Sequence, residues 1–350
     1  YVGMIIERVK VDYFTQSVKI SLFKDSWGMS LSSFLQSKFN LWVFKKLGWK
    51  FTYFYIFILG RCYFFFKRKE RNTIRKAVKS VFEGQKSKKE IRKTVREVYK
   101  GIIAHYFEKL FNAYSTSNTL KAFYDTHVDC PNLDLIRQEL SKGKGALLIT
   151  GHYGGVELIP GYLGIHHLPV SIIAKFKTQH LREQLMQKAP EFSTHIIDPS
   201  QTPNVISEIC SCLKENRIVI TQCDEIEEWR PSNKEKMVFL GKLIWMDKTM
   251  NLLIRRTKTS VLFGLMQRSR EKGYEFVLNS MEDMTHSLRM RANSSEGEVL
   301  LAALEHYIYS RPEEWYQWKK YFNMETVPLS EAPEEKLIPV PILQSSFSKT

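Results

Sequence analysis

The protein has 350 residues, of which 43% are hydrophobic and 25% are charged. These values are typical of a globular chain that can bury a large core, here one sizeable α/β domain with an appendage. The five cysteines are sparse, and none form a C-x-x-C pair. This pattern excludes a disulfide framework and a zinc ribbon, and it favours a reducing environment that faces the cytosol.

The net charge of +15 is concentrated near the N-terminus, where residues 1–100 hold 23 Lys and Arg against 7 Asp and Glu. Such a patch suits anionic lipid head groups, an acidic carrier protein or nucleic acid.

Residues 41–66 are rich in aromatic side chains that lie among lysines and arginines. The charge-free stretch from Phe51 to Gly60 is shorter than the roughly 20 apolar residues that a membrane-spanning helix needs. Aromatic rings next to cations are typical of a membrane interface, so we expect contact with a membrane surface; an aromatic-rich core helix is the alternative. Residues 1–40 show no clear period, and no secretory signal is recognised.

Residues 67–100 have apolar side chains at helical spacing and a strongly basic opposite face, with a break near Gly84. We expect two helices here. A solvated helix face and nucleic-acid binding are the alternatives. The aromatic segment that precedes these helices favours lipid.

From about residue 140 the pattern alternates between strands and helices, which predicts a mixed, mostly parallel sheet flanked by helices. The expected strands are 146–150, 170–174, 218–222, 261–266 and 274–278, and the expected helices are 156–165, 178–188, 203–215, 247–256 and 296–310. The expected regions are a basic helical membrane-associating segment (1–120), a catalytic α/β domain (121–323) and an extended tail (324–350).

Polar side chains follow the strands where ligands gather in open α/β sheets. His152 lies between glycines at the end of the strand 146–150, and Glu157 follows five residues later. A carboxylate on one ring nitrogen raises the basicity of the other, which can then take a proton from a hydroxyl. We therefore expect His152 to be a general base that Glu157 orients, although a strand-end histidine can also be structural.

The segment Gly151-His152-Tyr153-Gly154-Gly155-Val156-Glu157 resembles the H-x4-[D/E] block of the glycerolipid acyltransferase superfamily, in the form found in lipid A late acyltransferases. Further blocks follow in the family's order. They are Gln222-Cys223-Asp224, Val238-Phe239-Leu240-Gly241, Gln267-Arg268 with Gly273-Tyr274, and Arg311-Pro312 through Trp315 to Trp318. The resemblance covers roughly residues 55–323.

The resemblance implies roles for further residues. It places the amides of Gly154 and Gly155, or Arg268, at the oxyanion, and Asp224 in support of a loop. Lys175, Lys177 and Arg182 stand where the family often has an arginine that contacts the acceptor, and Glu225 replaces a family glutamine. Because lysine is a point charge rather than a bidentate fork, these departures leave the acceptor open.

The expected function is transfer of a fatty acyl chain from acyl carrier protein or coenzyme A to a hydroxyl of a lipid A-like glycolipid. A lysophospholipid acceptor and a non-enzymatic membrane scaffold are the alternatives. We expect no metal, no cofactor and no nucleic-acid partner; the Cys210 and Cys212 side chains are expected to pack within a helix. The expected location is the cytoplasmic face of the inner membrane, as a peripheral or monotopic protein that binds anionic lipid.

Overall fold

A computed structural model describes residues 35–37, 40, 42–43, 49–176, 178–271, 273–291 and 293–328. Contacts divide the chain into two compact units, with the boundary between Tyr63 and Phe64. Lys177, residues 1–34 and most of the tail lie outside the described residues, so the expectations for them stay predictions.

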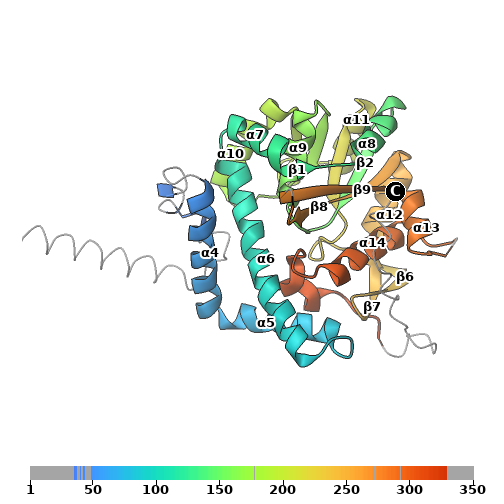
Figure 1. Ribbon diagram of the computed structural model, residues 1–350. Helices are drawn as coiled ribbons and strands as arrows, with labels where there is room; N and C mark the ends of the chain where they lie inside the picture. The colour runs from blue at the N-terminus through green and yellow to red at the C-terminus, as the bar shows by residue number, and fades with distance from the viewer. Residues whose placement is uncertain are drawn as a thin grey trace, which may run out of the picture. The chain divides into compact units, whose positions relative to one another are not determined.

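The helices of the described chain, labelled in Figure 1, are α4 Trp49–Phe66, α5 Arg68–Phe82, α6 Lys88–Tyr114, α7 Ser117–His127, α8 Leu133–Ser141, α9 Ile159–Ile165, α10 Gln179–Lys188, α11 Val205–Lys214, α12 Lys248–Thr257, α13 Met281–Ser287 and α14 Glu296–Ser310, with the 3-10 helices η2 Val156–Leu158, η3 Ala189–Phe192 and η4 Gln317–Asn323. The strands are β1 Val128–Asp129, β2 Ala146–Thr150, β3 Val170–Ile173, β4 Thr194–Ile197, β5 Ile218–Gln222, β6 Pro231–Phe239, β7 Lys242–Asp247, β8 Ser260–Ser269 and β9 Gly273–Ser280.

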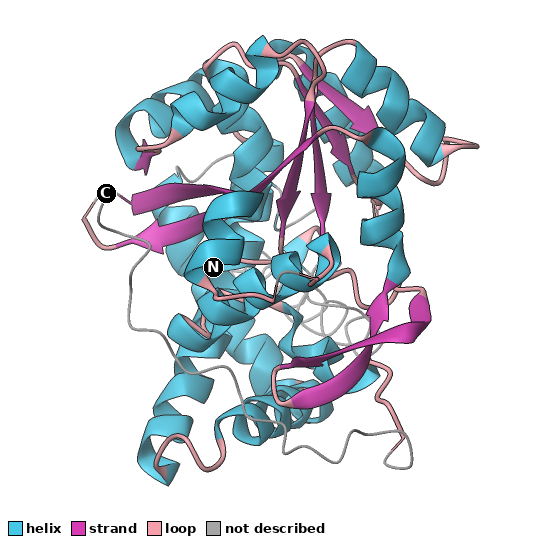
Figure 2. Ribbon diagram, turned by 90° about the vertical axis from the view of Figure 1, so that its right-hand side faces the viewer, coloured by secondary structure: helices cyan, strands magenta, loops and turns pink. Residues whose placement is uncertain are grey.

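The main sheet has seven strands in the order β1-β9-β8-β2-β5-β3-β4. Strands β8, β2, β5, β3 and β4 run parallel, whereas β9 pairs antiparallel with β8 and parallel with β1. Figure 2 shows these strands between helices, with the β6–β7 ribbon apart from them. The expected α/β fold with a mostly parallel sheet is confirmed.

The central strand β2 is buried along its whole length. Its five residues are apolar apart from Thr150, which is why the sequence predicted this strand at its observed bounds. Strand β5 pairs with β2 in the register Ala146 with Ile218 and Thr150 with Gln222. The residues that follow these two strands therefore leave the sheet side by side.

The β6–β7 hairpin was not predicted as a pair of strands, although its turn lies in the block Val238-Phe239-Leu240-Gly241 that resembles the family. Leu240 and Gly241 both have positive φ, at 49° and 76°, as a tight two-residue hairpin turn requires. The carboxylate of Glu305 on α14 accepts a hydrogen bond from the Leu240 amide. Burial raises the pKa of this carboxyl to about 7, against the effect of that bond.

Helix α5 buries an apolar stripe that includes Ile74, Val78 and Phe82. It packs against η4 near the end of the described chain, and the ring of Phe82 is tilted by 45° against that of Trp318. A capping box at Ser87 and Glu90 starts α6, after the break that Gly84 makes with a φ of 84°. The two expected basic helices are thus confirmed.

Helix α4 exposes large apolar side chains, including Phe51, Phe54 and Ile58, at helical spacing. Among the helices that the structure describes, none is both long enough and apolar enough to cross a membrane.

Candidate functional site

His152 and Asp224 meet where β2 and β5 end. The β2–β5 register continues past the strands, because the amide of Cys223 donates to the carbonyl of Thr150. Two residues further, His152 Nδ1 lies 2.9 Å from Asp224 Oδ1. The backbone amide of His152 also donates to the same carboxylate, at 2.9 and 3.1 Å. The Asp224 carboxylate thus fixes both the position and the tautomer of the imidazole.

Asp224 is fully buried, and its second oxygen accepts a 2.7 Å hydrogen bond from Trp315 Nε1. The neighbouring amide of Tyr316 donates to the carbonyl of His152. The C-terminal block that resembles the family motif therefore makes hydrogen bonds to both His152 and Asp224.

The other ring nitrogen of His152 contacts Glu225, at 3.2 Å from Nε2 to Oε2. Lys320 on η4 holds Glu225 at 3.2 Å and Glu227 at 2.9 Å. Burial disfavours a charge on the imidazole, but Asp224 and Glu225 outweigh it and raise the pKa of His152 to about 9. Against the effect of its own burial, Glu225 has its pKa lowered to about 2 by His152 and Lys320.

An imidazole that faces two ionised carboxylates donates from both nitrogens and is charged at neutral pH. In this arrangement His152 has no free lone pair. It can act as a base only when Glu225 leaves Nε2.

Aromatic rings join His152 to a second histidine. Tyr316 contacts the His152 ring edge-on, with centroids 5.1 Å apart, and stacks on His105 at 3.5 Å. Burial, together with the positive charges of Lys109 and Arg268, lowers the pKa of His105 well below its usual value. His105 is therefore a neutral ring within α6 that supports Tyr316.

The structure does not bring Glu157 to the imidazole of His152, whose two nitrogens are bonded to Asp224 and Glu225. Glu157 lies on η2 and accepts a 3.0 Å hydrogen bond from Lys109 on α6; His105 Nε2 is 4.0 Å away. Partial burial of Lys109 favours its neutral form, but Glu157 outweighs this effect and raises the pKa of the ammonium group. The expected contact differs because η2 turns Glu157 toward α6.

The amides of Gly154 and Gly155 are already bonded to the backbone. Gly154 N–H donates to the carbonyl of Glu314 and Gly155 N–H to that of Met266 on β8. A side chain at Gly154, where φ is 55°, would collide with the Met266 carbonyl oxygen. The oxyanion role expected for these amides is not supported, because the glycines serve close packing against β8.

Arg268 is likewise engaged in structure. Its guanidinium binds Glu108 twice, at 2.6 and 2.8 Å, and Glu314 at 2.8 Å. Remaining N–H groups approach the carbonyls of Gly101 and Gly154. Because the two carboxylates hold the guanidinium in this structural position, the oxyanion role expected for Arg268 is not supported either.

The expected acceptor-binding cations Lys175 and Arg182 form separate ion pairs. Lys175 is exposed and pairs with Glu228 at 2.9 Å, whereas Arg182 on α10 pairs with the buried Asp198 at 2.8 Å. Lys177 lies outside the described residues.

Sequence reasoning missed four groups at this edge: His105, Lys109, Tyr316 and Lys320. Tyr316 and Lys320 belong to or follow the C-terminal motif block, which was a usable signal. His105 and Lys109 lie one turn apart on one face of α6, and only tertiary packing brings that face to His152.

Among the described residues, a group with the donor types and spacing of a metal site occurs elsewhere, at His195, Glu208 and Cys212. His195 and Glu208 were not predicted.

A family model described as bacterial lipid A biosynthesis acyltransferase matches residues 30–323. A search of curated proteins finds no match to the chain. The family match spans every group described around His152.

Proposed function

The chain belongs to the bacterial lipid A biosynthesis acyltransferase family, and from this premise we propose that it moves a fatty acyl chain from an acyl thioester to a hydroxyl of a lipid A-like glycolipid. The observation that carries the proposal is the His152–Asp224 pair at the carboxyl edge of the sheet, 2.9 Å apart and mostly sheltered from solvent. Acyl carrier protein and coenzyme A both supply donors of this chemistry, and no cofactor takes part.

His152 is the proposed general base. Its Nε2 takes the proton of the acceptor hydroxyl while the hydroxyl oxygen attacks the thioester carbonyl. The C–O bond forms, the C–S bond breaks, and the imidazolium returns the proton to the leaving thiolate. The products are an ester and a free thiol. Asp224 stays ionised and stabilises the imidazolium in between.

Glu225 is the residue that the acceptor must displace. Its side chain is 38% exposed, whereas that of Asp224 is 0% exposed, so Glu225 has room to move and Asp224 does not. Once Glu225 moves, the His152 ring loses one of its two carboxylate neighbours and its pKa falls, so Nε2 can release its proton and present its lone pair to the hydroxyl. We assign Glu225 to gating of the base and not to the proton transfer itself.

Glu157 is proposed to act through Lys109. The ion pair holds an ammonium group whose pKa the charge of Glu225 also raises, which places Lys109 close to the reacting edge. A cation there can stabilise negative charge that develops on the thioester oxygen. Since Gly154, Gly155 and Arg268 are engaged elsewhere, Lys109 is the better candidate for this role.

Acceptor contacts are proposed for Lys175 and Arg182, with Lys177 beside them in the sequence. Lys175 follows β3, and Arg182 lies on the helix that comes after it. Phosphate on the acceptor would compete with Glu228 and Asp198 for these cations.

We propose a location on the cytoplasmic face of the inner membrane, as a peripheral or monotopic protein. The exposed apolar side chains of α4 and the basic face of α5 are the surfaces that suit anionic lipid. Helix α5 packs against η4, which carries Lys320. Contact of α5 with head groups would therefore bring the reacting edge to the lipid acceptor.

The decisive experiment measures acyl transfer from labelled acyl carrier protein and from labelled acyl-CoA. The acceptors are a lipid A precursor and, separately, a lysophospholipid, both in vesicles that contain anionic lipid. We expect transfer to the glycolipid, and a loss of about 10²–10⁴-fold in His152→Ala.

The matched control is His286→Ala, which removes an exposed histidine on α13 and should leave the rate unchanged. Transfer only to the lysophospholipid would replace the proposed acceptor. Equal rates for wild type and His152→Ala would overturn the mechanism.

A further inference from the structure

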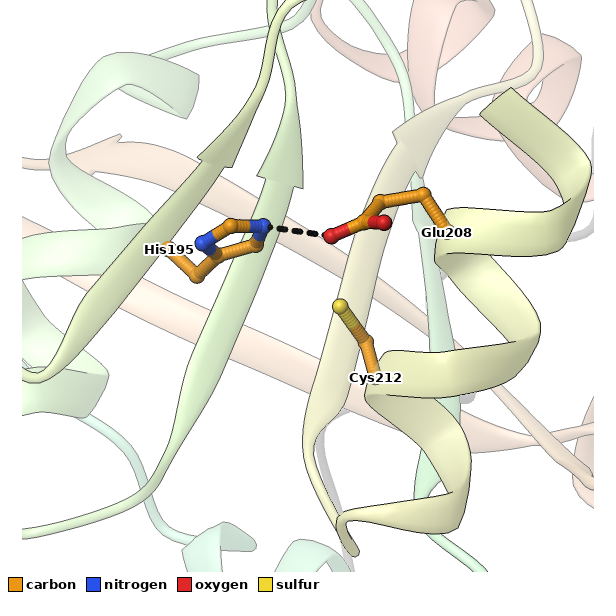
Figure 3. Close-up of side chains that lie close together, drawn as sticks. All are labelled: His195, Glu208 and Cys212. Atoms are coloured by element: carbon orange, nitrogen blue, oxygen red, sulfur yellow. Dashed lines mark hydrogen bonds and ion pairs between the residues drawn. The ribbon is translucent and has the colours of Figure 1, made fainter. Parts of the chain in front are cut away.

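Three side chains with metal-binding chemistry converge on the β4 edge of the sheet (Figure 3). They are His195 from β4 and Glu208 and Cys212 from α11, with one donor atom of each within 4.8 Å of the others. His195 Nε2 and Glu208 Oε1 are 3.0 Å apart. The figure shows the three side chains pointing into one gap between the strand and the helix.

Local structure explains the convergence. Glu208 and Cys212 are four residues apart on α11, so they share a helix face. Ser171 on β3 and His195 on β4 are partners in the parallel register, so their side chains leave the sheet on the same side. Ser171 forms a side-chain hydrogen bond with the Cys212 thiol, which shows that this is the side of the sheet that α11 covers.

The cluster is separate from the His152–Asp224 site at the carboxyl ends of β2 and β5. Strands β3 and β5 lie between β4 and β2, which at about 4.8 Å per strand is a distance of about 14 Å. None of the contacts around His152 involves these three residues.

We propose that His195, Glu208 and Cys212 bind a single Zn²⁺ ion, with water as its fourth ligand. An imidazole, a carboxylate and a thiolate match the nitrogen, oxygen and sulfur ligands that Zn²⁺ takes, whereas a sulfur ligand disfavours Mg²⁺ and Ca²⁺. The half-exposed side chains of His195 and Glu208, 47% and 39% accessible, leave the ion open to solvent on one side. The ion would join the edge strand to the helix above it.

Binding requires small movements and releases a proton. Tetrahedral ligands with bonds of about 2.0–2.1 Å lie about 3.3 Å apart, close to the observed separation of His195 and Glu208. The ion takes the place of the hydrogen-bonded proton between them, and the neutral His195 ring then carries its proton on Nδ1. The Cys212 thiol gives its proton to water and binds as thiolate.

Cys212 is the buried member of the cluster. The sulfur is buried, with 3% of the residue exposed, and burial together with Glu208 and Glu215 raises the thiol pKa while Ser171 and Arg217 lower it. Arg217 reaches this place through Ser171, to which its Nε donates at 2.8 Å. Ser171 can therefore orient the sulfur as an outer partner of the ion.

The test uses reduced, tag-free, full-length protein titrated with Co²⁺ and then with Zn²⁺. We expect one equivalent of Co²⁺ to give a sulfur-to-cobalt charge-transfer band that Zn²⁺ removes. Cys212→Ser should abolish the band. His195→Ala and Glu208→Gln, at exposed positions that tolerate change, should weaken binding by at least about tenfold.

Cys210→Ser is the matched control, because Cys210 lies on the same helix outside the cluster and should leave the band unchanged. A wild type without the band, or a band that persists in Cys212→Ser, overturns the proposal. The readout needs no acyl transfer, so it stands or falls apart from the proposed function.

Discussion

His152 and Arg268 are each held between two carboxylates, and only His152 is suited to chemistry. His152 lies between Asp224 and Glu225, and Arg268 lies between Glu108 and Glu314. Their side chains are similarly sheltered, with 14% and 20% exposed. His152 follows β2, and Arg268 lies near the end of β8, the parallel neighbour of β2.

The difference lies in the proton and in the partners. The pKa of His152 is about 9, so its ring can lose a proton at a pH that a folded protein tolerates. A guanidinium keeps its proton in any folded protein. Glu225 is 38% exposed and can move, but Glu108 and Glu314 are 1% and 4% exposed. A reactive cation needs an exchangeable proton and one movable partner; without them the same arrangement of charges is a structural bond.

The largest effect on the reactive side is expected from Asp224→Asn. The amide N–H₂ can donate to Nδ1 of His152, which then accepts a hydrogen bond. The ring proton is thereby kept on Nε2, the nitrogen that must be unprotonated to act as the base. We expect kcat/KM to fall by about 10²–10⁴-fold with the fold retained.

Steady-state rates and thermal unfolding of the same preparation check this prediction. Asp134→Asn, at an exposed carboxylate on α8, is the control. An active Asp224→Asn enzyme would show that Asp224 is structural, as first expected from the sequence, and would erase the contrast with Arg268.

Arg268→Met tests the structural side. It leaves Glu108 and Glu314 buried without their counter-charge, although burial already raises the pKa of Glu314 to about 7. Breaking a buried pair in this way costs about 3–5 kcal/mol of the free energy of unfolding. Denaturant unfolding measures the loss, with Arg270→Met as an exposed control near the end of the same strand.

The molecules of Arg268→Met that remain folded should keep their rate per active site. A stable but inactive variant would instead return Arg268 to the oxyanion role that the sequence suggested.

Glu225→Gln should move the pH profile. The base works when neutral, so the rate rises with pH and is half-maximal at the pKa of His152. Replacing one of two carboxylates lowers that pKa by at least about one unit, so the midpoint shifts down and the rate at neutral pH increases up to about tenfold. The dependence of kcat/KM on pH provides the measurement, and an unmoved midpoint would show that Glu225 does not gate the base.

The same raised pKa affects stability. The pKa of His152 is about 9 in the folded state, against a usual value of 6.5. The stabilisation that its bound proton gives to the folded state is therefore complete below about pH 6.5 and is lost as the pH rises toward about 9. Glu225→Gln should reduce this dependence.

Glu157→Gln is expected to have the smallest effect. If Glu157 acts by holding Lys109, kcat falls several-fold, by no more than about tenfold, and the pH midpoint is unchanged. A midpoint that moves down would place Glu157 on the imidazole during the reaction, where the H-x4-E spacing first suggested it. Lys109→Met should match the rate of Glu157→Gln, and the two changes together should not add.

The sheet was predictable because β2 and β5 are short, apolar and bounded by polar residues. His152 and Asp224 were both found as residues at strand ends, yet their pairing was not, since it depends on a register that periodicity does not reveal. The β6–β7 hairpin was missed because β6 exposes a polar run, Asn233 to Glu235, ahead of its apolar end. Arg268 was identified as a cation at a strand end, but its partner Glu108 lies 160 residues away.

The contacts of Trp315 and Tyr316 have a consequence for synthesis. His152 and Asp224 are translated long before residues 314–316, whose backbone and indole complete their surroundings. Residues 314–316 must therefore leave the ribosome before His152 is aligned. In the proposed membrane location, the nascent chain would meet lipid before the site is complete. A proteolytic cut just before Arg311 would remove the contacts that Trp315 and Tyr316 make with Asp224 and His152.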